Sequence, residues 1–146
     1  MMLSCRYESL DLLSLRRVAR EFAGSLRGGM VVALRGNLGV GKTAFSKEVI
    51  SCFSGEYFLG SPTFSLVHEY STPSSFSLYH VDLYRLSTLK EVQEVGFFDF
   101  CDNNLVLVEW PDILDGVVPF DINVRIAHSS DVGEMVRDVE IEWGKV

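Results

Sequence analysis

The sequence predicts an α/β domain whose mixed β-sheet has a parallel core, added antiparallel strands and flanking helices. Continuous apolar runs at 31–34 and 105–108 are typical of strands that are buried on both faces of a parallel sheet. Near the end of the chain, apolar and polar residues alternate over 122–126 and 139–143, as in antiparallel strands with one wet face. No repeat, low-complexity tract or linker interrupts the chain, so residues 1–146 are expected to form a single domain.

The remaining elements follow from local periodicity and from turn residues. Ser9 is expected to cap a helix that runs to about Leu26, because apolar residues recur there on one helical stripe. Two strand-like runs at 64–70 and 76–84 are separated by a short Ser/Thr/Pro segment, which predicts a hairpin. Residues 89–95 are expected to form a short helix that ends at a glycine.

A complete G-x-x-x-x-G-K-[ST] motif lies between the first buried run and a helical segment, with the sequence Gly36-Asn37-Leu38-Gly39-Val40-Gly41-Lys42-Thr43. Its glycines let successive backbone N–H groups point at phosphate oxygens, and the helix that follows aims its positive end at the same anion. Lys42 is expected to reach the β- and γ-phosphates, and the Thr43 hydroxyl to hold Mg²⁺. The order of strand, loop and helix favours a P-loop NTPase-like domain over the alternative, a plain glycine-rich turn. The expected nucleotide-binding residues of this loop are Asn37, Leu38, Gly39, Val40, Gly41, Lys42 and Thr43.

Charge and cysteine content limit the function classes. The net charge of −7 argues against a protein that grips nucleic acid alone, and the basic stretch within 16–27 reads more readily as a solvated helix face. Cys5, Cys52 and Cys101 are odd in number and widely spaced, which is typical of reduced cytosolic thiols. Residues 1–7 lack the apolar core of a secretory signal, and no segment has the length of a membrane span. We therefore expect a cytoplasmic protein without a membrane partner.

Two acidic residues are candidates for the second half of a phosphate site. Glu109 directly follows the buried run at 105–108, where a carboxylate could hold Mg²⁺ or polarise the attacking water. The alternative interpretation of Glu109 is an exposed carboxylate at the end of a strand, with no role in a site. Asp82 shares a strand face with His80 and is the second candidate. The alternative interpretation is that this segment is an ordinary edge strand with its polar face in solvent. A metal site formed by His80, Asp82 and His68 is disfavoured because the spacing matches no zinc pattern.

Two further observations concern the nucleotide. Ser61-Pro62-Thr63-Phe64 follows the loop, and in P-loop NTPases a threonine from such a segment often senses Mg²⁺ and the γ-phosphate. Taken alone, the segment could equally be an ordinary turn. No N-K-x-D or T-K-x-D stretch is present to read guanine, so ATP is favoured over GTP.

Four segments taken together resemble the bacterial tRNA threonylcarbamoyladenosine biosynthesis ATPases, the TsaE (YjeE) family. The resemblance extends from about residue 9 to residue 127 and is carried by the phosphate loop followed in order by Ser61-Pro62-Thr63-Phe64, His80-Val81-Asp82-Leu83-Tyr84-Arg85-Leu86 and Val108-Glu109-Trp110-Pro111.

The resemblance implies a small cytoplasmic ATPase that works with ATP, Mg²⁺ and two larger partner proteins. In that family those partners form a transferase complex that places a threonylcarbamoyl group on the adenosine beside the anticodon of tRNAs. The ATPase resets or licenses the complex and meets tRNA only indirectly, through the partners. An acidic net charge agrees with this arrangement.

The resemblance also implies roles for individual residues. Lys42 would bind phosphate, Thr43 and Glu109 would hold Mg²⁺, and Trp110 would be a neighbour of the nucleotide.

The resemblance implies roles for two more residues, and the chain differs from the family pattern at two places. Asp82 would be a carboxylate required for hydrolysis, and Thr63 would sense the γ-phosphate. Where the family has a Thr and a Gly before the first helix, this chain has Leu12 and Arg16, so no adenine contact is carried over from there. The family's late Gly-Arg is replaced by Gly133-Glu134.

Two other functions share the loop. A small-molecule P-loop kinase would need an arginine-rich lid, and the chain has no such insertion. A nucleotide-gated assembly module without significant turnover would use the same binding residues as the ATPase.

Overall fold

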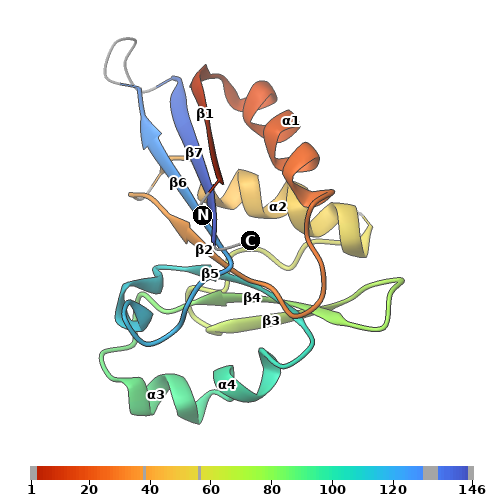
Figure 1. Ribbon diagram of the computed structural model, residues 1–146, viewed down its shortest axis with the longest axis vertical. Coiled ribbons are helices and arrows are strands. Elements are labelled where there is room, and N and C mark those ends of the chain that lie inside the picture. The colour runs from red at the N-terminus through yellow and green to blue at the C-terminus, as the bar shows by residue number, and fades with distance from the viewer. Residues whose placement is uncertain (1–2, 38, 56, 130–134, 145–146) are drawn as a thin grey trace.

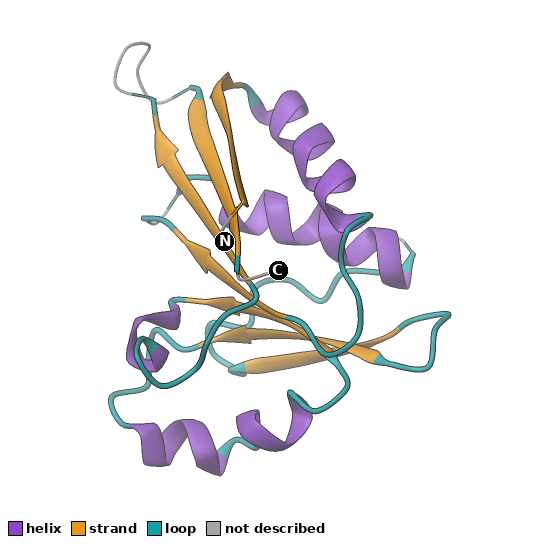
Figure 2. Cartoon of the chain, viewed as in Figure 1, coloured by secondary structure: helices purple, strands orange, loops and turns teal. Residues whose placement is uncertain are grey.

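The computed structural model describes residues 3–37, 39–55, 57–129 and 135–144. Within this part of the chain, seven strands form one sheet in the order β1-β7-β6-β2-β5-β4-β3, with helices against both faces (Figures 1 and 2). The elements in chain order are β1 Leu3–Leu10, α1 Leu12–Ala23, β2 Val31–Arg35, α2 Lys42–Ser54, β3 Val67–Ser71, β4 Ser77–Asp82, α3 Leu89–Glu94, α4 Phe97–Phe100, β5 Leu105–Glu109, the 3₁₀ helix η1 Pro111–Leu114, β6 Ile122–His128 and β7 Arg137–Trp143.

The pairing of the strands confirms the predicted mixed sheet. β6, β2, β5 and β4 are mutually parallel neighbours, and β2 and β5 are apolar and almost wholly buried. β3 joins β4 as an antiparallel hairpin, while β7 and then β1 extend the opposite edge in antiparallel fashion. The carboxyl ends of the parallel strands therefore lie at one edge of the sheet, where α/β proteins bind ligands.

Two apolar cores lie on opposite faces of the sheet, since alternate residues of each central strand point in opposite directions. α1 and α2 cover one face, where Leu105 and Leu107 of β5 join the larger core. α3, α4 and η1 cover the other face, where Val106 and Val108 join the smaller core (Figure 1). His80, Asp82 and Glu109 share the strand face of the larger core, toward α2.

The amino-terminal region differs from the prediction. Residues 3–10 form a strand that the sequence analysis did not expect, and Ser9 lies before the first helix with a φ of 54°. The cap is Asp11, whose carboxylate accepts a hydrogen bond from the Ser14 N–H at 2.8 Å. The helix ends at Ala23 with Gly24 as its C-cap, about three residues short of the predicted end at Leu26. Apolar and polar residues alternate over 3–8, the pattern of a strand with one wet face, and the prediction did not make use of it.

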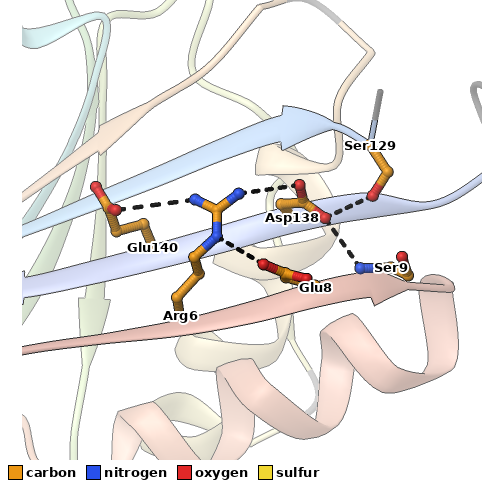
Figure 3. Close-up of polar contacts among 6 residues, drawn as sticks. All are labelled: Arg6, Glu8, Ser9, Ser129, Asp138 and Glu140. Carbon is orange, nitrogen blue, oxygen red and sulfur yellow. Dashed lines mark hydrogen bonds and ion pairs between the residues drawn. The ribbon is translucent and has the colours of Figure 1, made fainter. Parts of the chain in front are cut away.

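Charged side chains hold β1 against β7 (Figure 3). Arg6 of β1 lies 3.3 Å from a carboxylate oxygen of Asp138 and 3.9 Å from one of Glu140. Asp138 also accepts hydrogen bonds from the Ser9 N–H at 2.9 Å and from the Ser129 hydroxyl at 2.5 Å. The two hydrogen bonds, aided by the Arg6 charge, hold the pKa of Asp138 below its usual value.

The other elements are close to their predicted places. The hairpin strands are shorter than expected, and the helix at 89–94 is followed by an unpredicted turn of helix, α4. Thr88 caps α3 through a capping box with Glu91. In the described residues, no helix is both long and apolar enough to cross a membrane.

Candidate functional site

A cavity of about 570 Å³ opens at the carboxyl edge of the parallel strands, at the start of α2. Residues from the loop before α2, the segment before β3 and the ends of β4 and β5 line it. They are Arg16, Gly39, Gly41, Lys42, Thr43, Ala44, Lys47, Ser61, Thr63, Asp82, Glu109 and Trp110.

Close contacts explain two glycines of the loop. A Cβ at Gly36 would lie 2.5 Å from the carbonyl oxygen of Ile126, and one at Gly41 would lie 2.9 Å from the Leu15 side chain. Gly41 also has a φ of 118° and is the N-cap residue of α2. Only glycine fits where the loop passes so close to β6 and α1, so the loop is shaped by its neighbours as well as by its own sequence.

Lys42, the first residue of α2, places a buried ammonium group in the cavity. The residue is 6% exposed, and its Nζ has no hydrogen-bond partner among the described residues. Nζ lies 3.7 Å from the centre of the Trp110 ring, a cation–π contact. Burial lowers the pKa of Lys42, and the nearby charges of Glu109, Asp82 and Asp112 partly oppose that shift. A buried ammonium with three free donors is a group that an anionic ligand would satisfy.

Asp82 and Glu109 lie directly beside each other, because they are register partners on β4 and β5. Each is 3% exposed. Glu109 Oε2 lies 2.6 Å from His80 Nε2. Asp82 accepts hydrogen bonds from the Thr63 hydroxyl at 3.2 Å and from the Tyr84 N–H at 2.9 Å. Two carboxylates are thus held at the same edge of the sheet, next to Lys42.

The segment before β3 folds over this edge. The Leu66 N–H donates to the Pro62 carbonyl at 2.7 Å, and the Asp82 N–H donates to the Leu66 carbonyl at 2.9 Å. Thr63 therefore faces Asp82 from a turn that is tied to the end of β4. The Ser61 hydroxyl lies 3.1 Å from that of Thr63, which extends the polar chain toward the cavity.

Arg35 fixes the segment after β5. Its guanidinium makes two bonds to the Asp115 carboxylate, at 2.6 and 3.0 Å, and a third to Asn123 Oδ1 at 3.1 Å. The bonds to Arg35 hold the pKa of Asp115 below its usual range. Because Arg35 ends the strand that enters the phosphate loop and Asp115 follows η1, this pair ties Trp110 and η1 to the loop strand.

The structure places most of the predicted site residues together. Gly39, Gly41, Lys42 and Thr43 line the cavity together with Thr63, Asp82, Glu109 and Trp110. Val40 does not line this cavity, because its side chain is buried in the larger core. Asn37 lies on a neighbouring hollow with Arg35 and Gly36, and Leu38 lies outside the described residues.

The alternatives for the two carboxylates are wrong. Glu109 is buried and not an exposed strand end, and Asp82 ends a strand that pairs on both sides and is not an edge. The expected common face holds for His80 and Asp82, whereas Tyr84 lies beyond the strand and is exposed. His68 is instead hydrogen-bonded to Ser65 and to the Gly60 carbonyl.

Sequence reasoning missed four cavity residues, namely Arg16, Ala44, Lys47 and Ser61. Lys47 could have been found, since it lies four residues after Thr43 on the same face of α2. Arg16 was read as part of a solvated basic face, and only the packing of α1 on α2 brings it to the cavity. Both side chains are exposed to solvent at the cavity mouth.

The oxygen donors fit a magnesium ion that arrives with a nucleotide. Within the described part of the chain, no cluster of three or more His, Cys, Asp or Glu residues could hold a metal unaided. Mg²⁺ in phosphate sites takes one or two protein oxygens and completes its shell with phosphate oxygens and water. The Thr43 hydroxyl and the Glu109 carboxylate supply donors of that kind at the cavity wall.

The parallel core, the loop before α2 and the polar edge beside it define a P-loop α/β protein. The sequence profile of the family described as "Threonylcarbamoyl adenosine biosynthesis protein TsaE" matches residues 11–139. The chain belongs to the TsaE family.

Individual relatives agree with the family match. The tRNA threonylcarbamoyladenosine biosynthesis protein TsaE of Rickettsia bellii is 40% identical over 115 residues, covering 76% of this chain and 79% of the relative. That of Haemophilus influenzae is 30% identical over 142 residues, covering 92% and 89% of the two chains. The crystal structure of Bacillus subtilis YdiB has the same fold, with a TM-score of 0.74 at 24% identity over 99% of this chain and 88% of that one.

Proposed function

We propose that this protein is the Mg²⁺-dependent ATPase subunit that supports threonylcarbamoyladenosine modification of tRNA, acting in the cytoplasm with a two-protein transferase complex. One observation carries the proposal. The buried ammonium of Lys42, which has no hydrogen-bond partner in the part of the chain that the structure describes, lies in a cavity that also holds two buried carboxylates and the phosphate loop. The family to which the chain belongs supplies the biological setting.

ATP fits the charges of the cavity. The loop N–H groups and the α2 amino terminus would hold the phosphates, while Lys42 would exchange its contact with the Trp110 ring for phosphate oxygens. Thr43 and Glu109 would hold Mg²⁺, which would neutralise charge on the β- and γ-phosphates. No guanine-reading motif is present in the sequence, so we propose ATP as the nucleotide.

The chemistry follows from the two carboxylates. Asp82 or Glu109 would orient the attacking water and accept its proton, and Thr63 would sense the γ-phosphate from its position beside Asp82. In this state the Thr63 hydroxyl is occupied by Asp82, so a sensing role requires it to turn toward the nucleotide. Water positioning and charge stabilisation supply most of the rate of phosphoryl transfer, so small displacements here matter.

Partner dependence is part of the proposal. The cavity mouth is open, and Thr63 and Ser61 lie on a turn that is anchored mainly through Leu66. A partner surface that closes on this turn would exclude water and fix Thr63 over the γ-phosphate. The chain alone is therefore expected to bind ATP well and to hydrolyse it slowly. The tRNA would be held by the partners, in agreement with the net charge of −7.

The test is steady-state phosphate release by the chain alone, by the two transferase proteins alone and by the mixture. We expect turnover that exceeds the sum of the separate rates, and its loss in Glu109→Gln and Asp82→Asn variants that still bind ATP. Asp99→Asn is the matched control, because Asp99 is an exposed carboxylate on α4, across the sheet from the cavity. Fast turnover by the isolated chain that mixing does not change would favour a self-sufficient ATPase or a kinase.

A further inference from the structure

His80 is a fully buried polar residue of β4, with the apolar Leu78 on one side of it along the strand face and the buried Asp82 on the other. It is 0% exposed, and it lies between β3 and β5 with Leu107 as its register partner on β5. Its neighbour on the same strand face, Leu78, is an ordinary core residue. Burying an apolar side chain here would cost less free energy than burying an imidazole, so packing alone does not explain the histidine.

The polar contact of His80 is directed at the nucleotide site. Its Nε2 lies 2.6 Å from Oε2 of Glu109, and both side chains are almost completely buried. We assign the proton to Nε2, because a carboxylate that accepts this hydrogen bond needs the imidazole as its donor. The other ring nitrogen, Nδ1, has no partner among the described residues, which favours its unprotonated form because a buried N–H would be left unpaired.

The strand backbone and the hydrogen bond to Glu109 hold the imidazole ring in place. Phe58 lies over the ring with an interplanar angle of 29° and a centroid distance of 6.3 Å, near the upper end of the range for packed rings, so its contact adds packing only. The strand pairs on both sides, so its backbone has little freedom. A rigid donor at 2.6 Å therefore fixes both the position and the rotation of the Glu109 carboxylate.

The two carboxylates of the site differ in how many of their oxygens are already hydrogen-bonded to described residues. Both oxygens of Asp82 already accept hydrogen bonds, one from Thr63 and one from the Tyr84 N–H. Glu109 has its Oε2 occupied by His80, and it lines the cavity. Its Oε1 is thus the oxygen left for the cavity.

We propose that His80 is a positioning residue for Glu109. It holds Oε2 by its Nε2–H, so Glu109 presents a single, oriented oxygen, Oε1, to the nucleotide site. The inference rests on the proposed ATPase function. Hydrogen-bond partners that orient a ligand or base are typically worth about 10- to 100-fold in metal affinity or activity.

The first experiment compares two variants at His80 in the mixture with the transferase proteins. His80→Gln retains an N–H donor that can reach Glu109, whereas His80→Leu fills the site without a donor. We expect His80→Leu to lower kcat for phosphate release about 10- to 100-fold, with the Kd for ATP changed less than about 3-fold. His80→Gln should recover most of the lost kcat. Equal kcat for His80→Leu and the parent would overturn the proposal.

Phe58→Leu is the matched control, because it loosens packing around the imidazole and leaves the hydrogen bond to Glu109 in place. We expect its kcat to stay close to that of the parent. If Phe58→Leu lowers kcat as much as His80→Leu does, His80 acts through packing and the proposal is wrong. If His80→Leu does not fold, the comparison of His80→Gln with the parent decides: a kcat below one tenth of the parent value contradicts the proposal.

A second measurement does not depend on ATP turnover. In protein labelled with ¹⁵N-histidine, the ring signals of His80 should report the Nε2–H tautomer, and Glu109→Gln should shift them. An Nδ1–H tautomer, or signals that Glu109→Gln leaves unchanged, would contradict the pair. If the parent shows this tautomer but no turnover with the partners, the proposed function fails while the His80–Glu109 pair stands.

Discussion

Replacing Lys42 by Ala separates the ligand role of this lysine from its role in the fold. No described residue hydrogen-bonds the buried ammonium group, and leaving a buried polar group unpaired costs about 1–3 kcal/mol of folding free energy. Its contact with the Trp110 ring at 3.7 Å returns about 2 kcal/mol when desolvated. These contributions nearly cancel, so the free energy of unfolding without nucleotide should change by no more than about 1 kcal/mol.

ATP binding should respond quite differently to the same change. A charge-assisted hydrogen bond to phosphate contributes about 1.5–3 kcal/mol, which corresponds to roughly 10- to 150-fold in Kd. Isothermal titration calorimetry with ATP and Mg²⁺ measures the affinity, and thermal unfolding measures the fold. Lys90→Ala is the control, because Lys90 is an exposed lysine on α3. An ATP affinity that Lys42→Ala leaves unchanged, in a folded protein, would refute the assignment of the loop.

Three smaller predictions concern the scaffold around the site. The pKa of Asp138 lies below its usual value in the folded protein. Its ionised carboxylate therefore contributes fully to the free energy of unfolding above about pH 4, and this contribution disappears as the pH falls through the lowered pKa. The Tm difference between the parent and Asp138→Asn should accordingly be present at pH 6 and shrink below about pH 4, whereas a difference constant from pH 6 to pH 3 would show that its charge is irrelevant. Asp115→Asn should destabilise the fold by up to about 1 kcal/mol in urea unfolding, and Asp112→Asn, which alters a longer and more exposed pair, should cost less. Gly36→Ala should cost more stability than Gly39→Ala, because only at Gly36 would a Cβ collide with backbone, and equal Tm values for the two variants would contradict this.

The sequence indicated the centre of the sheet well and its amino-terminal edge poorly. The runs at 31–34 and 105–108 are buried on both faces, so their apolar character predicts strands of a parallel core, and the structure pairs them directly. β1 is an edge strand that pairs with β7 in antiparallel register, and Arg6 and Asp138 add an ion pair across the two strands. Its residues 3–8 alternate between apolar and polar, a strand signal that the prediction overlooked, and the helix was therefore begun two residues too early.

The candidate site shows the same division between local and long-range information. The loop residues Lys42 and Thr43 follow from a motif whose geometry is local. The bond between His80 and Glu109 joins residues 29 positions apart and depends on the register of β4 with β5, which the sequence does not display. Arg16 reaches the cavity only because α1 packs on α2, so its basic neighbours were read as a solvated face.

The most direct test of the central claim is multiple-turnover formation of threonylcarbamoyladenosine in a reconstituted system. The two transferase proteins, an unmodified tRNA, the threonylcarbamoyl donor and ATP would be incubated with this chain, with Lys42→Ala or without either, and the tRNA nucleosides quantified by mass spectrometry. The account predicts that modified adenosine accumulates beyond one equivalent of the complex only with the parent chain. Accumulation that is equal in all three reactions would contradict it.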